Sequence, residues 1–129
     1  MEGASLRVRS VGEGPAVVLV HGWALDLDMW RTQIDLLADR YHVIAFDRRG
    51  FGRSSGVPGI HQDVADIGRL LAWFDISHAA IVGMSQGARV ALRWALKHPQ
   101  QASCLVLDGP PAEGGSQPLG IQEIPLDDY

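Results

Sequence analysis

The motif best suited to chemistry is Gly-x-Ser-x-Gly, which runs from Gly83 to Gly87 with Ser85 at its centre. An apolar run, residues 78–82, leads into it, and a segment of helical periodicity begins at Gln86. A serine at such a corner takes strained backbone angles, and its neighbours must be small because the strand and the helix cross closely. The corner raises the Ser85 hydroxyl above the carboxyl edge of the sheet, where the amide of Gln86 can face a developing oxyanion. These residues indicate acyl transfer through a nucleophilic serine.

The elements that must hold this corner follow from the hydrophobic periodicity. Short apolar or alternating runs predict strands, and apolar positions that recur at helical spacing predict helices. The expected strands span residues 6–11, 16–20, 41–46, 78–82 and 103–107, and the expected helices span 29–40, 62–74 and 86–97. This alternation predicts an α/β fold with a doubly wound, mostly parallel sheet and helices on both faces.

Four segments that carry polar or aromatic side chains each follow a predicted strand. They are His21 to Trp23, residues 47–55, Ser85 and Asp108. Because the carboxyl ends of parallel strands share one edge of a sheet, these segments are expected to converge.

Composition limits the class of protein and of ligand. The 129 residues suit one domain, and 47% hydrophobic with 20% charged residues is typical of a soluble globular protein. The net charge of -4 provides no basic field for nucleic acid or an anionic membrane, so we expect a small, neutral or weakly charged ligand. No histidine and carboxylate cluster has the spacing of a metal site, and no glycine-rich loop has a phosphate-binding form, so no metal or cofactor is expected.

Cys104 is the only cysteine, which excludes an intramolecular disulfide. It lies in an apolar run, where we expect a buried and inert thiol. The first residues lack the basic and apolar segments of a signal peptide, and no apolar run approaches the ~18 residues of a membrane span. The resulting expectation is a cytoplasmic protein with no membrane segment.

Residues 5–112 resemble the amino-terminal half of an α/β-hydrolase, in the branch of carboxylesterases, lactonases and haloperoxidase-like esterases. The resemblance rests on four landmarks in the family's order: His21-Gly22-Trp23, the loop from Asp47 to Ser54, Gly83 to Gly87, and Leu105-Val106-Leu107-Asp108. It implies a sheet that is truncated before the cap and the last strands. Residues 1–112 are then the amino-terminal part of the hydrolase domain, and residues 113–129 are a loop or linker towards the missing part.

The same resemblance assigns roles to individual positions. It implies that Ser85 is the catalytic nucleophile and that the backbone N–H groups of Trp23 and Gln86 form the oxyanion hole. The ring of Trp23 either lines an acyl pocket or is a core aromatic, and both alternatives stay open at this point.

Several other polar residues are implied to be structural. His21 precedes the serine, whereas the catalytic histidine of this fold comes last, so His21 is expected to pack beneath the oxyanion loop. Asp47, Arg48 and Arg49 resemble a turn that braces this loop, with phosphate binding by the arginines as a lesser alternative. Residues 53–55 are expected to be solvated loop.

The catalytic acid and the catalytic histidine are not found at the family's positions, because those positions follow strands that this sequence does not reach. The remaining histidines are predicted to lie away from Ser85; they are His42, His61, His78 and His98. Asp108 follows a strand from which some branches of the family present the acid, but capping of the next turn is the favoured role for it.

Two hypotheses follow for the function. The first is a serine hydrolase of carboxylic esters, incomplete in this chain because the chain is a fragment, or completed by a companion chain or a swapped dimer. The alternative is a catalytically inactive α/β-hydrolase-like protein that binds a small ligand. A dehalogenase of this family would carry aspartate in place of Ser85, which argues against that branch.

Overall fold

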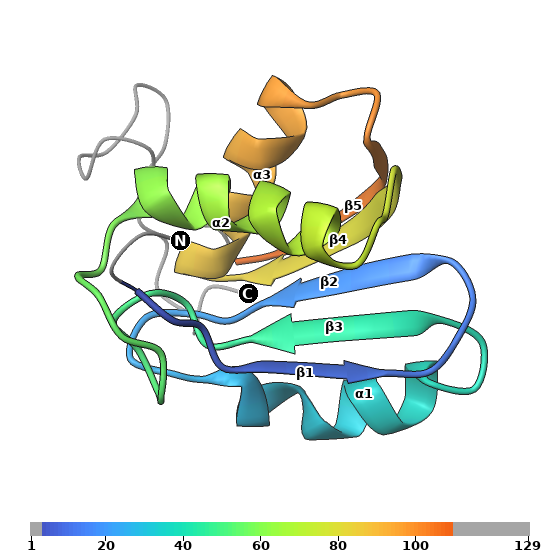
Figure 1. Cartoon of the computed structure of the whole chain (residues 1–129), viewed down its shortest axis with the longest axis horizontal. Coiled ribbons are helices and arrows are strands. Elements are labelled where there is room, and N and C mark those ends of the chain that lie inside the picture. Colours follow the sequence, from blue (N-terminus) through green and yellow to red (C-terminus); the bar gives the residue numbers. More distant parts are fainter. Residues whose placement is uncertain (1–3, 110–129) are drawn as a thin grey trace, which may run out of the picture.

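A computed structural model describes residues 4–109, which form a five-stranded sheet flanked by helices (Figure 1). The strands are β1 Val8–Val11, β2 Ala16–Val20, β3 His42–Phe46, β4 Ala79–Met84 and β5 Ala102–Asp108. The helices are the short 3₁₀ helix η1 Leu27–Trp30, α1 Arg31–Leu37, α2 Ile60–Trp73 and α3 Gln86–Lys97. The strand order is β1-β3-β2-β4-β5, in which β1 is antiparallel to β3 and the other pairs are parallel. The predicted α/β class and mostly parallel sheet are confirmed.

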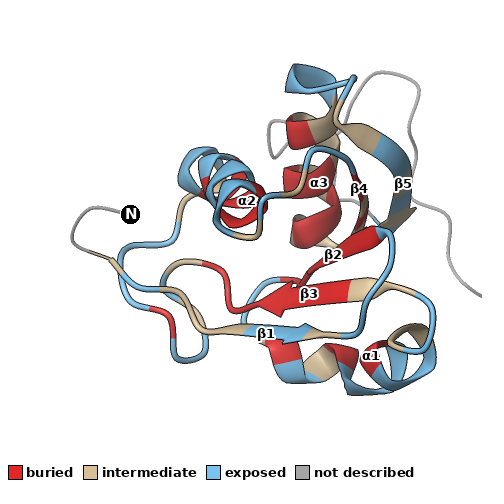
Figure 2. Ribbon diagram, turned by 45° about the vertical axis from the view of Figure 1, so that its right-hand side comes forward, coloured by how far each residue is buried: buried red, intermediate tan, exposed pale blue. Residues whose placement is uncertain are grey.

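Two apolar layers cover the sheet, because successive side chains of a strand point to opposite faces. In β2, Val18 and Val20 pack in the layer that α2 and α3 complete, whereas Val17 and Leu19 pack in the layer that η1 and α1 complete. Figure 1 shows α1 on one side of the sheet and α2 and α3 on the other. Every residue of β2 is buried, and β2 and β3 form the buried centre in Figure 2. This explains why residues 16–20 are a continuous apolar run.

The predicted bounds agree best where an element is amphipathic or fully covered. Residues 16–20 and 86–97 coincide with β2 and α3. The predicted helix 29–40 is divided and shorter, since α1 ends at Leu37. Trp30, which joins η1 to α1, has φ -93° and ψ 8°, outside the α region.

Cys104 of β5 is exposed, so the expectation of a buried thiol is wrong. Leu105 and Leu107 pack against the layer of α2 and α3, and Cys104 and Val106 alternate with them towards the opposite face. On that face α1 and η1 pack on β2 and β3. Among the described residues, β5 is therefore covered by helix on one side only. Figure 2 shows its exposed stretch at the margin of the sheet, beside β4.

Candidate active site

Ser85 occupies the turn between the end of β4 and the first residue of α3. Its backbone has φ 54° and ψ -119°, a conformation that residues other than glycine rarely adopt. Its amide donates a hydrogen bond to the carbonyl oxygen of Asp108 at the end of β5, with an N–O distance of 2.7 Å. The strained corner expected from the motif is present and is held by the neighbouring strand. Asp108 meets this corner through its main chain, and the role of its carboxylate stays a prediction.

Glycines allow the strand and the helix to cross at this corner. A Cβ atom added at Gly83 would lie 2.3 Å from the carbonyl oxygen of Gly87. One added at Gly87 would lie 2.2 Å from the carbonyl oxygen of Val20. Both distances are far below van der Waals contact, so the main chains of β4, α3 and β2 approach one another only because these positions lack side chains.

The loop after β2 lies directly against Ser85, as the sequence predicts. A Cβ atom added at Gly22 would lie 3.4 Å from the Cβ atom of Ser85. The next residue, Trp23, is 61% exposed, and its ring meets Phe51 edge to face with centroids 5.1 Å apart. The ring of Trp23 is therefore not part of the core that residues 4–109 form. Gln86 is the first residue of α3, where backbone N–H groups have no partner inside the helix; the oxyanion hole of these two amides stays a prediction.

His21 is fully buried and holds the loop after β2 in place. Its Nε2 accepts a hydrogen bond from the backbone N–H of Arg48 at 2.8 Å, and its Nδ1 lies 2.7 Å from the carbonyl oxygen of Gly22, to which it donates. Burial lowers the pKa of His21 below its ordinary value, with the nearby Arg48 charge acting in the same direction. The neutral ring uses both nitrogens in structural contacts, as expected of a structural histidine.

Asp47, directly after β3, braces the loop that carries Trp23. Its buried carboxylate accepts hydrogen bonds from the backbone amides of Leu27 at 2.7 Å and Arg53 at 2.8 Å, and from Nε of Arg7 at 2.6 Å. Burial alone would raise the pKa of Asp47, but the Arg7 and backbone hydrogen bonds together hold it below its ordinary value. The carboxylate is therefore ionised and ties several loops together.

Arg48 is buried beneath the site, with an exposed fraction of 1%. It forms an ion pair with Asp63 of α2, with Nη2 and Oδ2 2.9 Å apart. Its other donors reach the carbonyl oxygen of His21 at 3.2 Å and the side-chain oxygen of Gln86 at 2.6 Å. Burial raises the pKa of Asp63 above its ordinary value, an effect that the Arg48 charge opposes.

Arg49 forms a second pair with the buried Asp66 of α2, with Nη2 and Oδ1 2.8 Å apart. Both arginines are thus engaged by carboxylates, which argues against the phosphate-binding alternative. Sequence reasoning did not identify Asp63 or Asp66. The available signal was that both lie beside the apolar positions of the predicted helix 62–74, where a carboxylate needs a cationic partner.

Ser54 corrects a further expectation. Residues 53–55 were expected to be solvated, but the Ser54 side chain is buried. Its hydroxyl donates to the carbonyl oxygen of Asp47 at 2.5 Å and accepts from the backbone N–H of Arg7 at 2.9 Å. A small side chain that can both donate and accept satisfies two backbone groups that would otherwise be buried without partners.

The other four histidines lie away from Ser85. His42 begins β3 and His78 precedes β4, so both lie at the amino ends of these strands, whereas Ser85 follows the carboxyl end of β4. His98 follows α3, about 18 Å along the helix from Ser85 at the usual rise per residue. His61 lines the same surface hollow as His98. Within residues 4–109 no imidazole is hydrogen-bonded to the Ser85 hydroxyl.

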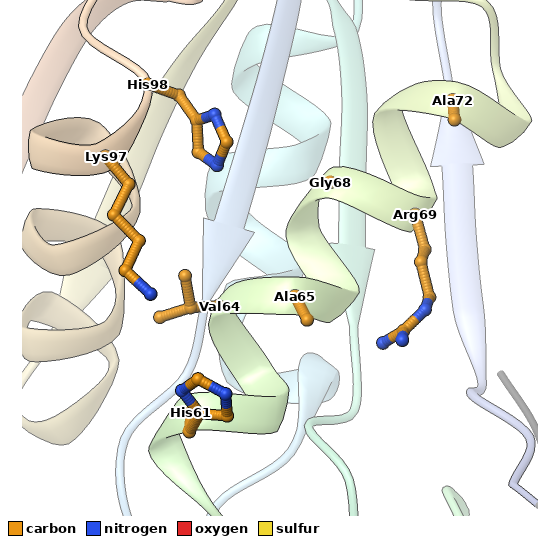
Figure 3. A pocket seen from close by; sticks show the side chains of 8 residues that line it. All are labelled: His61, Val64, Ala65, Gly68, Arg69, Ala72, Lys97 and His98. Carbon is orange, nitrogen blue, oxygen red and sulfur yellow. The ribbon is translucent and has the colours of Figure 1, made fainter.

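This hollow, of about 430 Å³, lies between α2 and α3 and is open to solvent (Figure 3). Figure 3 shows Lys97 of α3 extending towards Val64 and His61 of α2. The residues that line it are His61, Val64, Ala65, Gly68, Arg69, Ala72, Lys97 and His98. Because Ser85 is not among them, the hollow is not the place where a substrate would meet the serine.

Within residues 4–109, no three side chains of histidine, cysteine, aspartate or glutamate gather as a metal ion would require. None of the helices in this range is both long and apolar enough to cross a bilayer.

The comparisons with known proteins agree with this geometry. Residues 15–124 match the family model of the alpha/beta hydrolase fold. The chain belongs to the α/β-hydrolase family. As an α/β-hydrolase it is similar to the crystal structure of a probable hydrolytic enzyme from Pseudomonas aeruginosa, with a TM-score of 0.77 and 34% identity over 83% of this chain and 37% of that one.

Curated relatives of this α/β-hydrolase chain include enzymes of different named activities. A pimeloyl-[acyl-carrier protein] methyl ester esterase of Chromobacterium violaceum is 38% identical over 80% of this chain and 40% of its own length. A fluoroacetate dehalogenase of a Burkholderia species is 36% identical over 75% of this chain and 35% of its own length. The chain therefore spans about two-fifths of the length of the relatives it matches.

Replacing Gly87 by alanine tests the close crossing of α3 and β2. The new Cβ atom would meet the carbonyl oxygen of Val20, which cannot move away freely, so we expect the free energy of unfolding to fall by about 1–3 kcal/mol. Gly68→Ala is the matched control, because an added Cβ atom in the middle of α2 meets nothing and should raise the free energy of unfolding by about 1 kcal/mol. Urea denaturation measures both, and a Gly87 variant as stable as the parent would contradict the geometry.

The neutral state of His21 makes stability depend on pH. Its pKa is lowered in the folded chain, so below the ordinary value of 6.5 the unfolded chain binds the proton more readily. The free energy of unfolding should therefore decrease as the pH falls from about 7.5 to about 5.5, a range that brackets the ordinary histidine pKa. Urea denaturation at the two pH values should show a smaller decrease in the free energy of unfolding for His21→Gln than for the parent. His42→Gln is the control: it leaves His21 in place and should show the same decrease as the parent. Equal pH dependence in the parent and in His21→Gln would contradict this explanation.

Proposed function

We propose that this chain carries the nucleophile of a serine hydrolase that cleaves carboxylic esters through an acyl-Ser85 intermediate. The observation that carries the proposal is the position of Ser85, in a strained turn at the start of α3 and against the loop of Gly22. In this arrangement the N–H groups of Trp23 and Gln86 serve as the oxyanion donors. The related methyl ester esterase supports the ester class of substrate.

The chemistry of a serine oxygen favours esters over alkyl halides, although one relative is a dehalogenase. If Ser85 displaced a halide from an alkyl carbon, the product would be an ether, which offers no carbonyl carbon for water to attack. If Ser85 attacks an ester, the alcohol leaves and the acyl-enzyme is itself an ester. Water then attacks that ester, the acid is released and the Ser85 hydroxyl is regained, with the same two amides stabilising each oxyanion.

This reaction needs a base that takes the proton of Ser85 and returns it to the leaving alcohol. The sequence holds five histidines, at positions 21, 42, 61, 78 and 98, and all of them are among the described residues. None contacts the Ser85 hydroxyl, and His21 has both nitrogens engaged. The base in this proposal belongs to further polypeptide, which is the remainder of a longer chain, a companion chain or a second copy that exchanges elements. Asp108 stays a candidate for the acid.

The second candidate is a protein that binds a small ligand and does not turn it over. It is favoured by the distance of the described histidines from Ser85. The two candidates differ in whether Ser85 reacts when a base is supplied.

A labelling experiment with added base separates them. The purified chain is incubated with a fluorophosphonate probe, with and without free imidazole, and the labelled residue is located by mass spectrometry. We expect an adduct at Ser85 that forms faster when imidazole supplies the missing base, because the serine and the oxyanion donors are already in place. In Ser85→Ala the adduct at position 85 should be absent.

Exposed Ser103 serves as an internal control, since it lies within the strand β5 and not at the start of a helix. If a chain that circular dichroism shows to be folded is labelled no faster at Ser85 than at Ser103, even with imidazole, the hydrolase proposal is wrong and the binding protein is favoured.

A further inference from the structure

A single guanidinium group connects the two segments that hold the candidate oxyanion donors. Nη1 of Arg48 donates to the carbonyl oxygen of His21, two residues before Trp23, at 3.2 Å. Nη2 of the same group donates to the side-chain oxygen of Gln86 at 2.6 Å. The loop after β2 and the first residue of α3 are thereby joined through one rigid, planar group.

The guanidinium is itself fixed on its remaining sides. Its Nε donates to Oδ2 of Asp63 at 3.0 Å, and Nη2 lies 2.9 Å from the same oxygen. The ring of Phe51 lies 5.0 Å from the Arg48 Cζ atom, and that ring also contacts Trp23. With 1% of its side chain exposed, Arg48 has no room for another rotamer.

Stabilisation of α3 does not explain this position. A cation near the amino terminus of a helix opposes the helix dipole, and burial adds a desolvation cost. Gln86 begins α3, so Arg48 stands where an arginine is unfavourable for the helix. A positive charge at this point does favour negative charge that forms at the end of the helix, which is where the proposed reaction develops an oxyanion.

We propose that Arg48 is a positioning residue for the oxyanion site, which sets the separation of the Trp23 and Gln86 amides by binding the His21 carbonyl and the Gln86 side chain together. The inference rests on the proposed function and adds a residue to it. Two amides stabilise one oxyanion only if both point at the same place, and a displacement of about 1 Å can cost up to about 100-fold in rate. Asp63 takes part as the anchor of the guanidinium.

Three variants isolate this role. Gln86→Met keeps the backbone amide of residue 86, the Asp63 pair and the Phe51 contact, and removes only the acceptor. Arg48→Lys keeps a charge but cannot bind both partners at once. Arg49→Lys is the matched control, because the guanidinium of Arg49 is hydrogen-bonded to Asp66 and not to the loop after β2 or to Gln86. Each variant is measured by fluorophosphonate labelling of Ser85 in the presence of imidazole and by ¹⁵N relaxation dispersion of the Trp23 and Gln86 amides.

We expect Gln86→Met and Arg48→Lys each to slow labelling by about ten- to a hundredfold and to give both amides microsecond to millisecond exchange. Arg49→Lys should do neither. The double variant Arg48→Lys, Gln86→Met should be labelled no more slowly than Arg48→Lys alone, because both changes remove the hydrogen bond between residues 48 and 86.

The relaxation measurement keeps this inference separate from the proposed function. If the parent chain is not labelled but both amides become mobile in Gln86→Met, the hydrolase proposal fails and the positioning role stands. If Gln86→Met leaves both amides as rigid as in the parent and the labelling rate unchanged, the positioning role is overturned. Gln86→Met decides this even if Arg48→Lys does not fold.

Discussion

The close crossing of β4 and α3 is the constraint on which the site depends. With glycine at positions 83 and 87, the two main chains touch, the chain turns within one residue, and Ser85 takes its strained conformation. The same lack of side chains brings the first turn of α3 against the end of β2. Since β2 and β4 are parallel neighbours, the loop of Trp23 and the serine then emerge side by side at one sheet edge.

Buried polar groups hold the loops around this crossing. Asp47 accepts hydrogen bonds from the backbone amides of Leu27 and Arg53. Arg48 connects α2 to the loop after β2 and to the first residue of α3, which flank the candidate oxyanion site. His21 contributes as a neutral ring that accepts and donates once each. A hydrophobic core resists change of volume but not small rotations of a loop, whereas directional hydrogen bonds resist both. The sheet therefore determines where the site lies, and this hydrogen-bond network fixes the positions of the loops around it.

The fold and the placement of Ser85 were predictable because they depend on local patterns: apolar periodicity defines strands and helices, and the glycine spacing defines the corner. The exposure of Cys104 was not predictable, since it depends on which face of β5 a helix covers. The burial of Ser54 and the pairing of Arg48 with Asp63 depend on partners distant in sequence. Tertiary contacts of this kind leave no periodic signal, although a carboxylate beside an apolar stripe is a usable hint.

The order of the strands also bears on when the site forms. The chain makes β3 and α2 between β2 and β4, so the pairing of Val20 with Gly83 closes a loop of about sixty residues. Contacts at such separation are entropically costly and slow to form compared with the helices and with the β2–β3 and β4–β5 pairs, whose partners lie about 25 residues apart in sequence. We expect the loop of Trp23 and the turn of Ser85 to meet only late in folding. Partly folded chains would then contain most of the secondary structure and none of the site.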